Sequence, residues 1–338
     1  MAIFLNILFL ILGLALLIKG ADFFVSGASA IAKKCKVPSL FIGLTIVALG
    51  TSLPELSVSA ASAISNSLDM SIGNIVGSNM FNMLFIIGLV SLFKPIPMSV
   101  SSKKIDLPFL IAITGSLLLF SLDMALNGAS SNMLSRTESV LFLIVLTLYI
   151  YILISNANRK RKRQLKQEQF LSKNQPVTIK ETKEKELKIW QIILYVICGL
   201  AAIVFGGECV STTAQFLAIK MGMSEALVGL TIVAVGTSLP ELVTSVVAAK
   251  KGENDIAIGN VVGSSIINIS LILGIVGLIA QAPISSIIVT DIIILFVCTI
   301  IFSIMCIQKE NVSKKEGIIL LILYIAYITF TIIRNYCF

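Results

Sequence analysis

The stretch GLTIVALGTSLPELSVSA, residues 43–60, begins as an apolar helix and then places polar and helix-breaking residues in its middle. These residues are Gly50, Thr51, Ser52, Pro54 and Glu55. Proline has no amide hydrogen and clashes with the carbonyl four residues earlier, so Pro54 should break the helix at Gly50. Glu55 should share one helical face with Thr51 and Ser52, which precede it by four and three residues. We therefore expect a helix break that gathers a carboxylate, two hydroxyls and freed carbonyls, including that of Ala48.

The surrounding sequence is that of a membrane protein. The chain has 338 residues, of which 57% are hydrophobic and 13% are charged. Apolar runs recur along it, each long enough to cross a hydrocarbon core of about 30 Å. A β-barrel would instead show short alternating segments. We predict an all-α polytopic membrane protein with ten transmembrane helices, the first of them a retained helix and not a signal peptide. The predicted spans are 3–31, 39–64, 70–93, 105–123, 137–155, 189–218, 225–249, 255–280, 285–307 and 317–335.

The opening stretch occurs twice. GLTIVALGTSLPEL at 43–56 returns as GLTIVAVGTSLPEL at 229–242, and IGNIVGSNMFN at 72–82 returns as IGNVVGSSIIN at 258–268. Such self-similarity is the mark of an internal duplication. Five predicted spans separate equivalent points, and five is odd, so the two copies should enter the membrane in opposite directions. Inverted repeats of this kind place ion sites near the membrane midplane, where broken helices of both halves meet.

The repeats predict two halves and a linker. We expect a first half at 1–155, with its repeat at about 39–93, and a second half at 189–338, with its repeat at about 225–280. Residues 156–188 form a basic linker that holds eleven of the 26 Lys and Arg residues. The positive-inside rule places this linker in the cytoplasm and both termini outside, in the cell membrane. We prefer this interpretation of the basic residues to nucleic-acid binding.

The second copy supplies a matching set of polar residues. Thr237, Ser238 and Glu241 repeat the hydroxyls and the acid, and Gly236 and Pro240 repeat the helix break. The following span carries polar residues every four positions, and those of its copy match them. They are Asn74, Ser78 and Asn82 in the first half and Asn260, Ser264 and Asn268 in the second. Gly73 and Gly77, with their equivalents Gly259 and Gly263, should permit close helix approach.

This constellation suits a hard cation. Two carboxylates facing each other in a low dielectric repel unless a cation or a proton lies between them. Ca²⁺ takes six to eight oxygen ligands in flexible geometry, whereas Mg²⁺ gives up its water reluctantly. The chain contains no histidine, which excludes histidine metal sites and Ser-His or Cys-His catalysis. Asp22 and Glu208, at equivalent places in the first and sixth spans, are further candidates for an ion pathway, and Asp22 could pair with Lys19.

Paired GTSLPE and GNxxGS motifs in two repeats resemble the cation/Ca²⁺ exchanger superfamily, on its Na⁺/Ca²⁺ exchanger side. The resemblance covers both halves and implies exchange of several Na⁺ for one Ca²⁺ by electrogenic alternating access, in which the first and sixth spans slide across the core. It implies Ca²⁺ binding by Glu55, Glu241, Thr51 and Thr237. It implies Na⁺ binding by Ala48, Thr51, Ser52, Glu55, Ser78, Ala234, Thr237, Ser238, Glu241 and Ser264.

One position departs from the family. Many relatives have Asn at the position of Asn82 and Asp at that of Asn268, whereas this chain has Asn at both. Two glutamates still neutralise one Ca²⁺. In the potassium-dependent branch the Asp is implicated in K⁺ handling, so the resemblance implies transport without K⁺.

Other functions remain open at this point. An H⁺-coupled Ca²⁺ or other divalent cation antiporter would use the same acids, while an ion channel or an intramembrane enzyme fits the repeats less well. We expect Na⁺ and Ca²⁺ as transported ions and no organic cofactor. The expected partners are the lipid bilayer and inorganic cations, not nucleic acid, and the sequence does not indicate an oligomeric state.

Overall fold

The protein is a bundle of helices, seen in a computed structural model that describes residues 2–65, 68–128, 131–174, 187–222, 234–281 and 283–337. Seven helices in these ranges are long and apolar enough to cross a membrane. A further pair, Ser39–Thr51 and Leu53–Ile64, passes the same test together and is bent by 46°, which makes eight if the pair is one span. The chain is therefore built as a helical, multi-pass membrane protein.

The first half runs through α1 to the long helix α9. Its elements are α1 (Ala2–Cys35), α2 (Ser39–Ile42), η1 (Gly43–Val47), α3 (Ala48–Thr51), α4 (Leu53–Ile64), α5 (Leu68–Met80), η2 (Phe81–Ile86), α6 (Ile87–Phe93), β1 (Ile96–Pro97), η3 (Ser102–Asp106), α7 (Leu107–Phe120), α8 (Asp123–Asn127), β2 (Asn132–Met133) and α9 (Arg136–Asn174). The η segments are π-helical turns within longer helices, which the sequence pattern does not predict.

The second half, as far as it is described, contains a similar series of elements. Its elements are α10 (Ile189–Lys220), α12 (Ala234–Thr237), α13 (Leu239–Lys250), α14 (Asn254–Ile267), η5 (Asn268–Ile272), α15 (Leu273–Ile279), β3 (Pro283–Ile284), α16 (Ser286–Gln308), β4 (Asn311–Val312) and α17 (Lys314–Cys337). The short strands pair between the halves, β1 with β4 and β2 with β3, both antiparallel. The predicted span 225–249 is only partly covered, because residues 223–233 lie outside the described residues.

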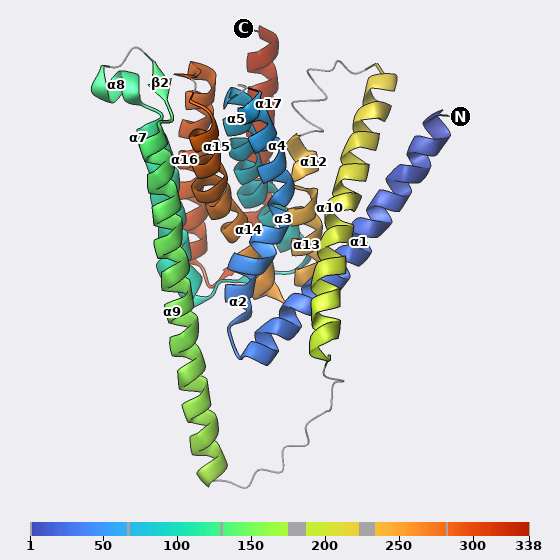
Figure 1. The fold of residues 1–338 in the computed structure, drawn as a ribbon, viewed down its shortest axis with the longest axis vertical. Coiled ribbons are helices and arrows are strands. Elements are labelled where there is room, and N and C mark those ends of the chain that lie inside the picture. Colours follow the sequence, from blue (N-terminus) through green and yellow to red (C-terminus); the bar gives the residue numbers. More distant parts are fainter. Residues whose placement is uncertain are drawn as a thin grey trace.

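Helices α1 and α10 form an outer pair and cross each other in opposite directions (Figure 1). Their contact is made by glycines. A Cβ added at Gly199 would lie 2.8 Å from the Gly20 oxygen, and one at Gly206 would lie 2.8 Å from the Gly13 oxygen. Backbone therefore meets backbone along this crossing, as small residues permit in membrane helices. Glycines spaced seven apart on both helices were the signal for this contact in the sequence.

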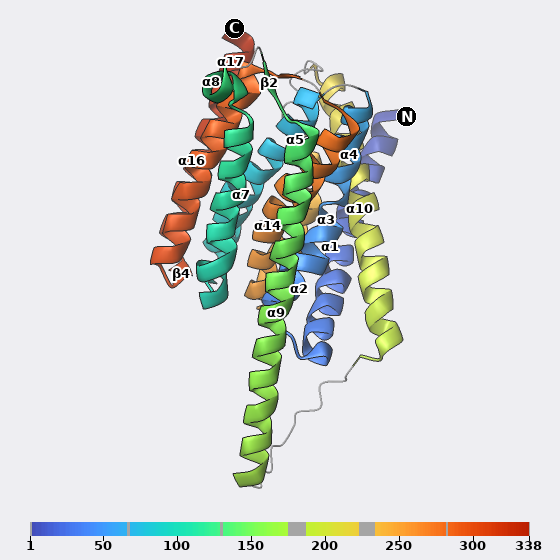
Figure 2. The same ribbon diagram turned by 60° about the vertical axis from the view of Figure 1, so that its left-hand side comes forward.

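The centre of the bundle is built from the two repeats, and the outer helices flank it. Helix α4 packs on α5 and α13 packs on α14, while α14 also packs on η1. Helices α7 and α16 lie side by side at one edge, and α1 and α10 lie at the opposite edge (Figures 1 and 2). Helix α17 covers α6 as α9 covers α15, so each half is closed by the last helix of the other side. The polar motifs thus end up in the interior.

Two helix limits differ from the sequence prediction. Helix α9 continues without a break from Arg136 to Asn174, so the basic residues 159–163 extend a membrane helix and are not a separate loop. A run of Lys, Arg, Gln and Leu keeps high helix propensity and gives no stop signal. The fourth span begins before the predicted residue 105, because a π-helical turn at Ser102–Asp106 leads into α7. The linker region 175–186 lies outside the described residues.

The glycine contact between α1 and α10 predicts a difference between two neighbouring residues. Gly206→Ala should destabilise the protein by about 1–3 kcal/mol, because the added methyl must push the helices apart. Gly207→Ala is the matched control, since its added Cβ would lie 3.4 Å from Pro240 Cγ, an ordinary contact. Thermal unfolding in detergent should show a lower midpoint for the first variant only. Equal midpoints would contradict the close packing.

Candidate functional site

Both helix breaks place a glutamate at the start of a half-helix. Ser52 precedes α4 and Ser238 precedes α13, each with ψ of 7°, and each half-helix has a proline in its first two positions. Glu55 and Glu241 lie in these first turns. Helix N-termini carry a partial positive charge and unpaired amide groups, which favour an anionic side chain there. The prolines fit because their missing N–H would be unpaired at this position in any case.

The breaks differ from the sequence prediction in one detail. The Ala48 carbonyl is not released from the backbone ladder, because it accepts the Ser52 amide at 3.1 Å. It additionally receives the Ser264 hydroxyl at 3.4 Å from the other half. In the second half the Ser238 amide bonds to the Val235 carbonyl instead, at 3.1 Å. A carbonyl can accept two hydrogen bonds, so Ala48 keeps its helical bond and still faces the site.

The two glutamates are held crosswise by hydroxyls of opposite halves. The Ser238 hydroxyl lies 3.0 Å from Glu55 Oε1, and the Ser52 hydroxyl lies 3.2 Å from Glu241 Oε1. Ser78 adds a contact of 3.3 Å to Glu55 Oε1 and lies 2.8 Å from Ser238. Both glutamates are 0% exposed. The equivalent residues of the two repeats therefore form one buried site.

Two asparagines, on α5 and α14, accept hydrogen bonds from the threonines of the site. Asn260 Oδ1 accepts the Thr51 hydroxyl at 2.9 Å, and Asn74 Oδ1 accepts the Thr237 hydroxyl at 3.4 Å. Each amide nitrogen donates in turn to a serine, Asn74 to Ser59 and Asn260 to Ser245. The sequence interpretation did not include these two serines. They are repeat equivalents, so the alignment of the two halves was the signal that could have found them.

Several buried oxygens of the site have no hydrogen-bond partner among the described residues. They are Glu55 Oε2, Glu241 Oε2, Asn82 Oδ1 and Asn268 Oδ1. The turn η5, which begins at Asn268, packs on α4, and η2, which carries Asn82, packs on α13. Buried carboxylate and amide oxygens without a partner are costly unless a cation or water satisfies them. Carboxylate and amide oxygens are also the atom types that a hard cation prefers as ligands.

No basic side chain neutralises the two glutamates within the described part of the chain. The ion pairs there involve Asp22, Asp291 and Glu316, each with a Lys or Arg. No group of three or more His, Cys, Asp or Glu side chains in the same ranges could hold a metal ion. A cation at this site would therefore be held by two carboxylates together with hydroxyl, amide and carbonyl oxygens.

The two candidate pathway acids make their contacts with residues outside this site. Asp22 pairs with Lys251 at 2.7 Å, so the pairing with Lys19 considered from the sequence is wrong. The partner follows α13 and is far away in sequence, which local spacing cannot predict. Glu208 accepts the hydroxyl of Thr212 on its own helix at 3.2 Å. Neither acid contributes to the crosswise arrangement.

The GxxxG prediction holds for the second half. Added Cβ atoms at Gly259 and Gly263 would lie 2.9 Å from backbone oxygens of Leu40 and Leu44. An added Cβ at Gly77 would meet no described atom within 4 Å, and one at Gly73 would lie 3.4 Å from Ile288. The segment equivalent to Leu40–Leu44 includes residues outside the described ranges, so the prediction for Gly73 and Gly77 stays a prediction.

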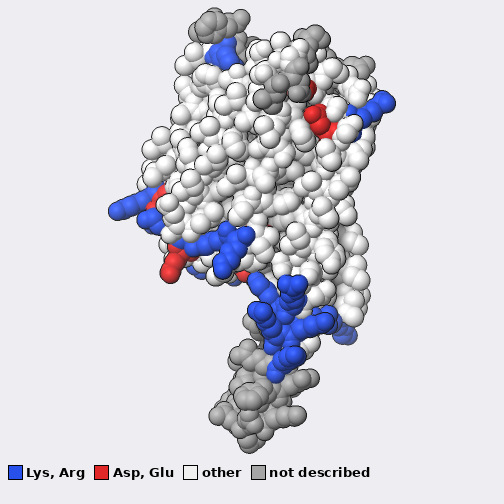
Figure 3. Space-filling view, turned by 90° about the vertical axis from the view of Figure 1, so that its left-hand side faces the viewer, with Lys and Arg blue, Asp and Glu red and all other residues white. Residues whose placement is uncertain are grey.

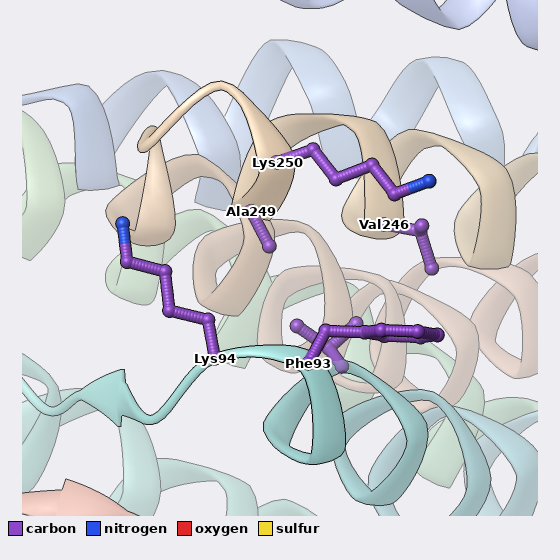
Figure 4. Close-up of a pocket in the computed structure, with 6 residues that line it drawn as sticks. Phe93, Lys94, Val246, Ala249 and Lys250 are labelled. Carbon is purple, nitrogen blue, oxygen red and sulfur yellow. The ribbon is translucent and has the colours of Figure 1, made fainter.

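A separate cavity of about 200 Å³ lies between the ends of α6 and α13. Lys94 and Lys250 flank its apolar lining, which includes Phe93 and Val246 (Figure 4). Two ammonium groups and no carboxylate make it unsuited to a cation. The buried glutamates, and not this cavity, are the candidate ion site.

Comparison with known proteins agrees with this geometry. The family model described as sodium/calcium exchanger protein matches residues 5–155 and 191–333. This chain belongs to the sodium/calcium exchanger family. It is 34% identical to the sodium/calcium exchanger MaX1 of Methanosarcina acetivorans, over 96% of this chain and 97% of that protein. It is 32% identical to the inner membrane protein YrbG of Escherichia coli, over 92% of each chain.

Solved structures show the same fold. The sodium/calcium exchanger from Methanococcus jannaschii superposes with a TM-score of 0.79 at 27% identity, covering 97% of this chain and 98% of that one. Family membership, this fold and the buried oxygen cluster together support exchange of cations, including Ca²⁺, across a membrane. Since the family and two of these relatives are described as sodium/calcium exchangers, the chain is accordingly a membrane transporter of inorganic cations.

The contacts of Ser264 predict an effect on Na⁺ use. Its hydroxyl reaches the Ala48 carbonyl and the Thr51 hydroxyl of the opposite half, both at 3.4 Å. Ser264→Ala should raise the Na⁺ concentration for half-maximal transport by about fivefold, the equivalent of about 1 kcal/mol. Ser270→Ala is the control, because that hydroxyl is buried but bonds to Ile266 in its own helix. An equal shift in both variants would exclude Ser264 as a site residue.

Proposed function

We propose that this protein is a secondary active antiporter that exchanges several Na⁺ for one Ca²⁺ by alternating access. Ca²⁺ lies between Glu55 and Glu241 with help from Thr51 and Thr237. Na⁺ occupies flanking positions made by the hydroxyls and carbonyls of both halves. Na⁺ and Ca²⁺ cannot occupy the site at the same time, because both ions require the same carboxylates. Exchange is electrogenic when the Na⁺ ions that enter carry more charge than the Ca²⁺ that leaves.

The observation that carries this proposal is the crosswise bonding of the two glutamates. Each fully buried carboxylate accepts a serine hydroxyl from the opposite half and leaves its second oxygen without a described partner. Two buried negative charges cost several kcal/mol each unless they are compensated. One Ca²⁺ compensates both charges at once. Two or more Na⁺ do the same, which makes the two ions alternative occupants of one site.

The architecture we propose contains ten spans in two inverted five-helix halves, 1–155 and 189–338. They are joined by the linker 156–188, whose first part continues helix α9 as far as Asn174. Opposite directions of α1 and α10 support the inversion (Figure 1). Polar contacts hold α1 to the end of α13 on one side, including the pair of Asp22 with Lys251 and a hydrogen bond from Ser29 to Glu253. For α1 and α10 to shift across the core, these contacts must break.

The charge distribution supports an orientation in the cell membrane. Lysines and arginines gather at the lower end of the molecule, around the extension of α9, and a broad uncharged surface lies above them (Figure 3). The exposed residues of this extension include Arg159, Lys160 and Arg163. Under the positive-inside rule this end is cytoplasmic. Both termini are then extracellular.

Neutralising either glutamate should abolish transport. In the proposed site Glu55→Gln or Glu241→Gln removes half of the charge that holds Ca²⁺, so Na⁺-driven ⁴⁵Ca²⁺ uptake into vesicles should fall to background. Asp106→Asn is the matched control, because Asp106 is buried as well but accepts the Tyr149 hydroxyl outside the site. Normal uptake by either glutamine variant would contradict the site assignment.

The coupling ion can be identified with separately imposed gradients. We expect ⁴⁵Ca²⁺ uptake by reconstituted protein with a Na⁺ gradient, none with a pH gradient alone, and no dependence on K⁺. A membrane potential that is positive on the Na⁺ side should accelerate uptake, because net positive charge moves away from that side during exchange. Uptake driven by a pH gradient without Na⁺ would instead establish H⁺-coupled exchange of a divalent cation.

A further inference from the structure

A chain of three hydrogen-bonding groups leads from the backbone of α14 to the amide of Asn268. The Asn79 side chain on α5 donates through Nδ2 to the Ser265 carbonyl at 3.1 Å. Asn268 donates through its own Nδ2 to Asn79 Oδ1 at 3.0 Å. Asn79 and Asn268 are both 0% exposed. The chain therefore crosses the interface between the two repeats in a region without solvent.

The direction of this chain is set by its first member. A backbone carbonyl can only accept a hydrogen bond, so Asn79 must turn its NH₂ group toward Ser265. Its oxygen then faces Asn268, which must turn its own NH₂ group toward Asn79. The Asn268 oxygen is left pointing away, buried and without a described partner. An amide has one donor end and one acceptor end, so this orientation decides which end the interior meets.

The equivalent position in the other half has no such chain. Asn79 corresponds to Ser265, whose hydroxyl bonds back to Val261 in its own helix at 2.9 Å. Asn82, the counterpart of Asn268, has neither its nitrogen nor its oxygen bonded to a described residue. The two central amides are therefore unlike each other, although the repeats align.

We propose that Asn79 is a positioning residue that holds the oxygen of Asn268 toward the cation site. The inference rests on the proposed function and deepens it, because it explains how a chain with Asn in place of the acid retains an oxygen ligand there. A free amide could offer its NH₂ group, which repels a cation. An aspartate needs no such support, because both of its outer atoms are oxygens.

A double-mutant cycle tests this role through Ca²⁺ affinity. Four proteins are compared by equilibrium ⁴⁵Ca²⁺ binding in detergent without Na⁺: the unmodified chain, Asn79→Leu, Asn268→Asp and the double variant. Asn79→Leu should weaken Ca²⁺ binding about tenfold, the scale of a lost partner behind a metal ligand. In the Asn268→Asp background the same change should alter the dissociation constant less than about twofold, since the carboxylate presents an oxygen in either orientation.

A purely structural role predicts a different result. If Asn79 only stabilises the packing of α5 on α14, its replacement should weaken binding equally in both backgrounds, and that result would overturn the inference. No change in either background would overturn it as well. If Asn79→Leu does not fold, as judged by thermal unfolding, Asn79→Ala is used in the same cycle, because the smaller side chain also removes the acceptor.

Failure of the proposed function would look different again. It would show as absent Ca²⁺ binding by the unmodified chain, or as binding that Glu55→Gln leaves unchanged, and it would overturn the inference together with the function. When the unmodified chain binds Ca²⁺ and Glu55→Gln does not, the cycle reports on Asn79 alone.

Discussion

Two carboxylates buried without a basic partner are the constraint on which the rest of this structure depends. In the described residues neither Glu55 nor Glu241 pairs with Lys or Arg, and both lie at 0% exposure. The fold compensates part of this cost with helix N-termini and with serine hydroxyls of the opposite half. Under the proposed function, a bound cation compensates the remainder. On that proposal, closure of the protein around a bound cation is favoured over closure of the empty site, because only the cation compensates the two carboxylates.

Much of this site was predictable because its motif occurs twice in the sequence. The duplicated GTSLPE motif predicted the two breaks, and the helical spacing placed Glu55 on the face of Thr51 and Ser52. Crosswise bonding from Ser238 to Glu55 was not predictable, because it depends on how the halves meet in space and not on local spacing. The same holds for Asp22 and its distant partner. The C-terminal limit of α9 was placed too early, because charged residues with high helix propensity do not indicate where a helix ends.

Departures from the repeat carry as much information as the repeat itself. Asn79 has no asparagine counterpart, so an alignment of the halves gives it no weight. Its contacts with the Ser265 carbonyl and with Asn268 nevertheless set the orientation of a central amide. Duplication supplies the symmetric frame in which two glutamates meet. Single replacements within that frame then make the two sides of the central site chemically distinct.

The glycine crossing of α1 and α10 has a mechanical consequence. One helix comes from each half, and their backbones touch at Gly13 with Gly206 and at Gly20 with Gly199. Because their backbones lie so close together at these glycines, we expect the two helices to move together as one rigid body. When such a rigid body tilts, both of its ends change position. In the exchange that we propose, a movement of this pair that uncovers the buried oxygens on one side of the membrane would cover them on the opposite side.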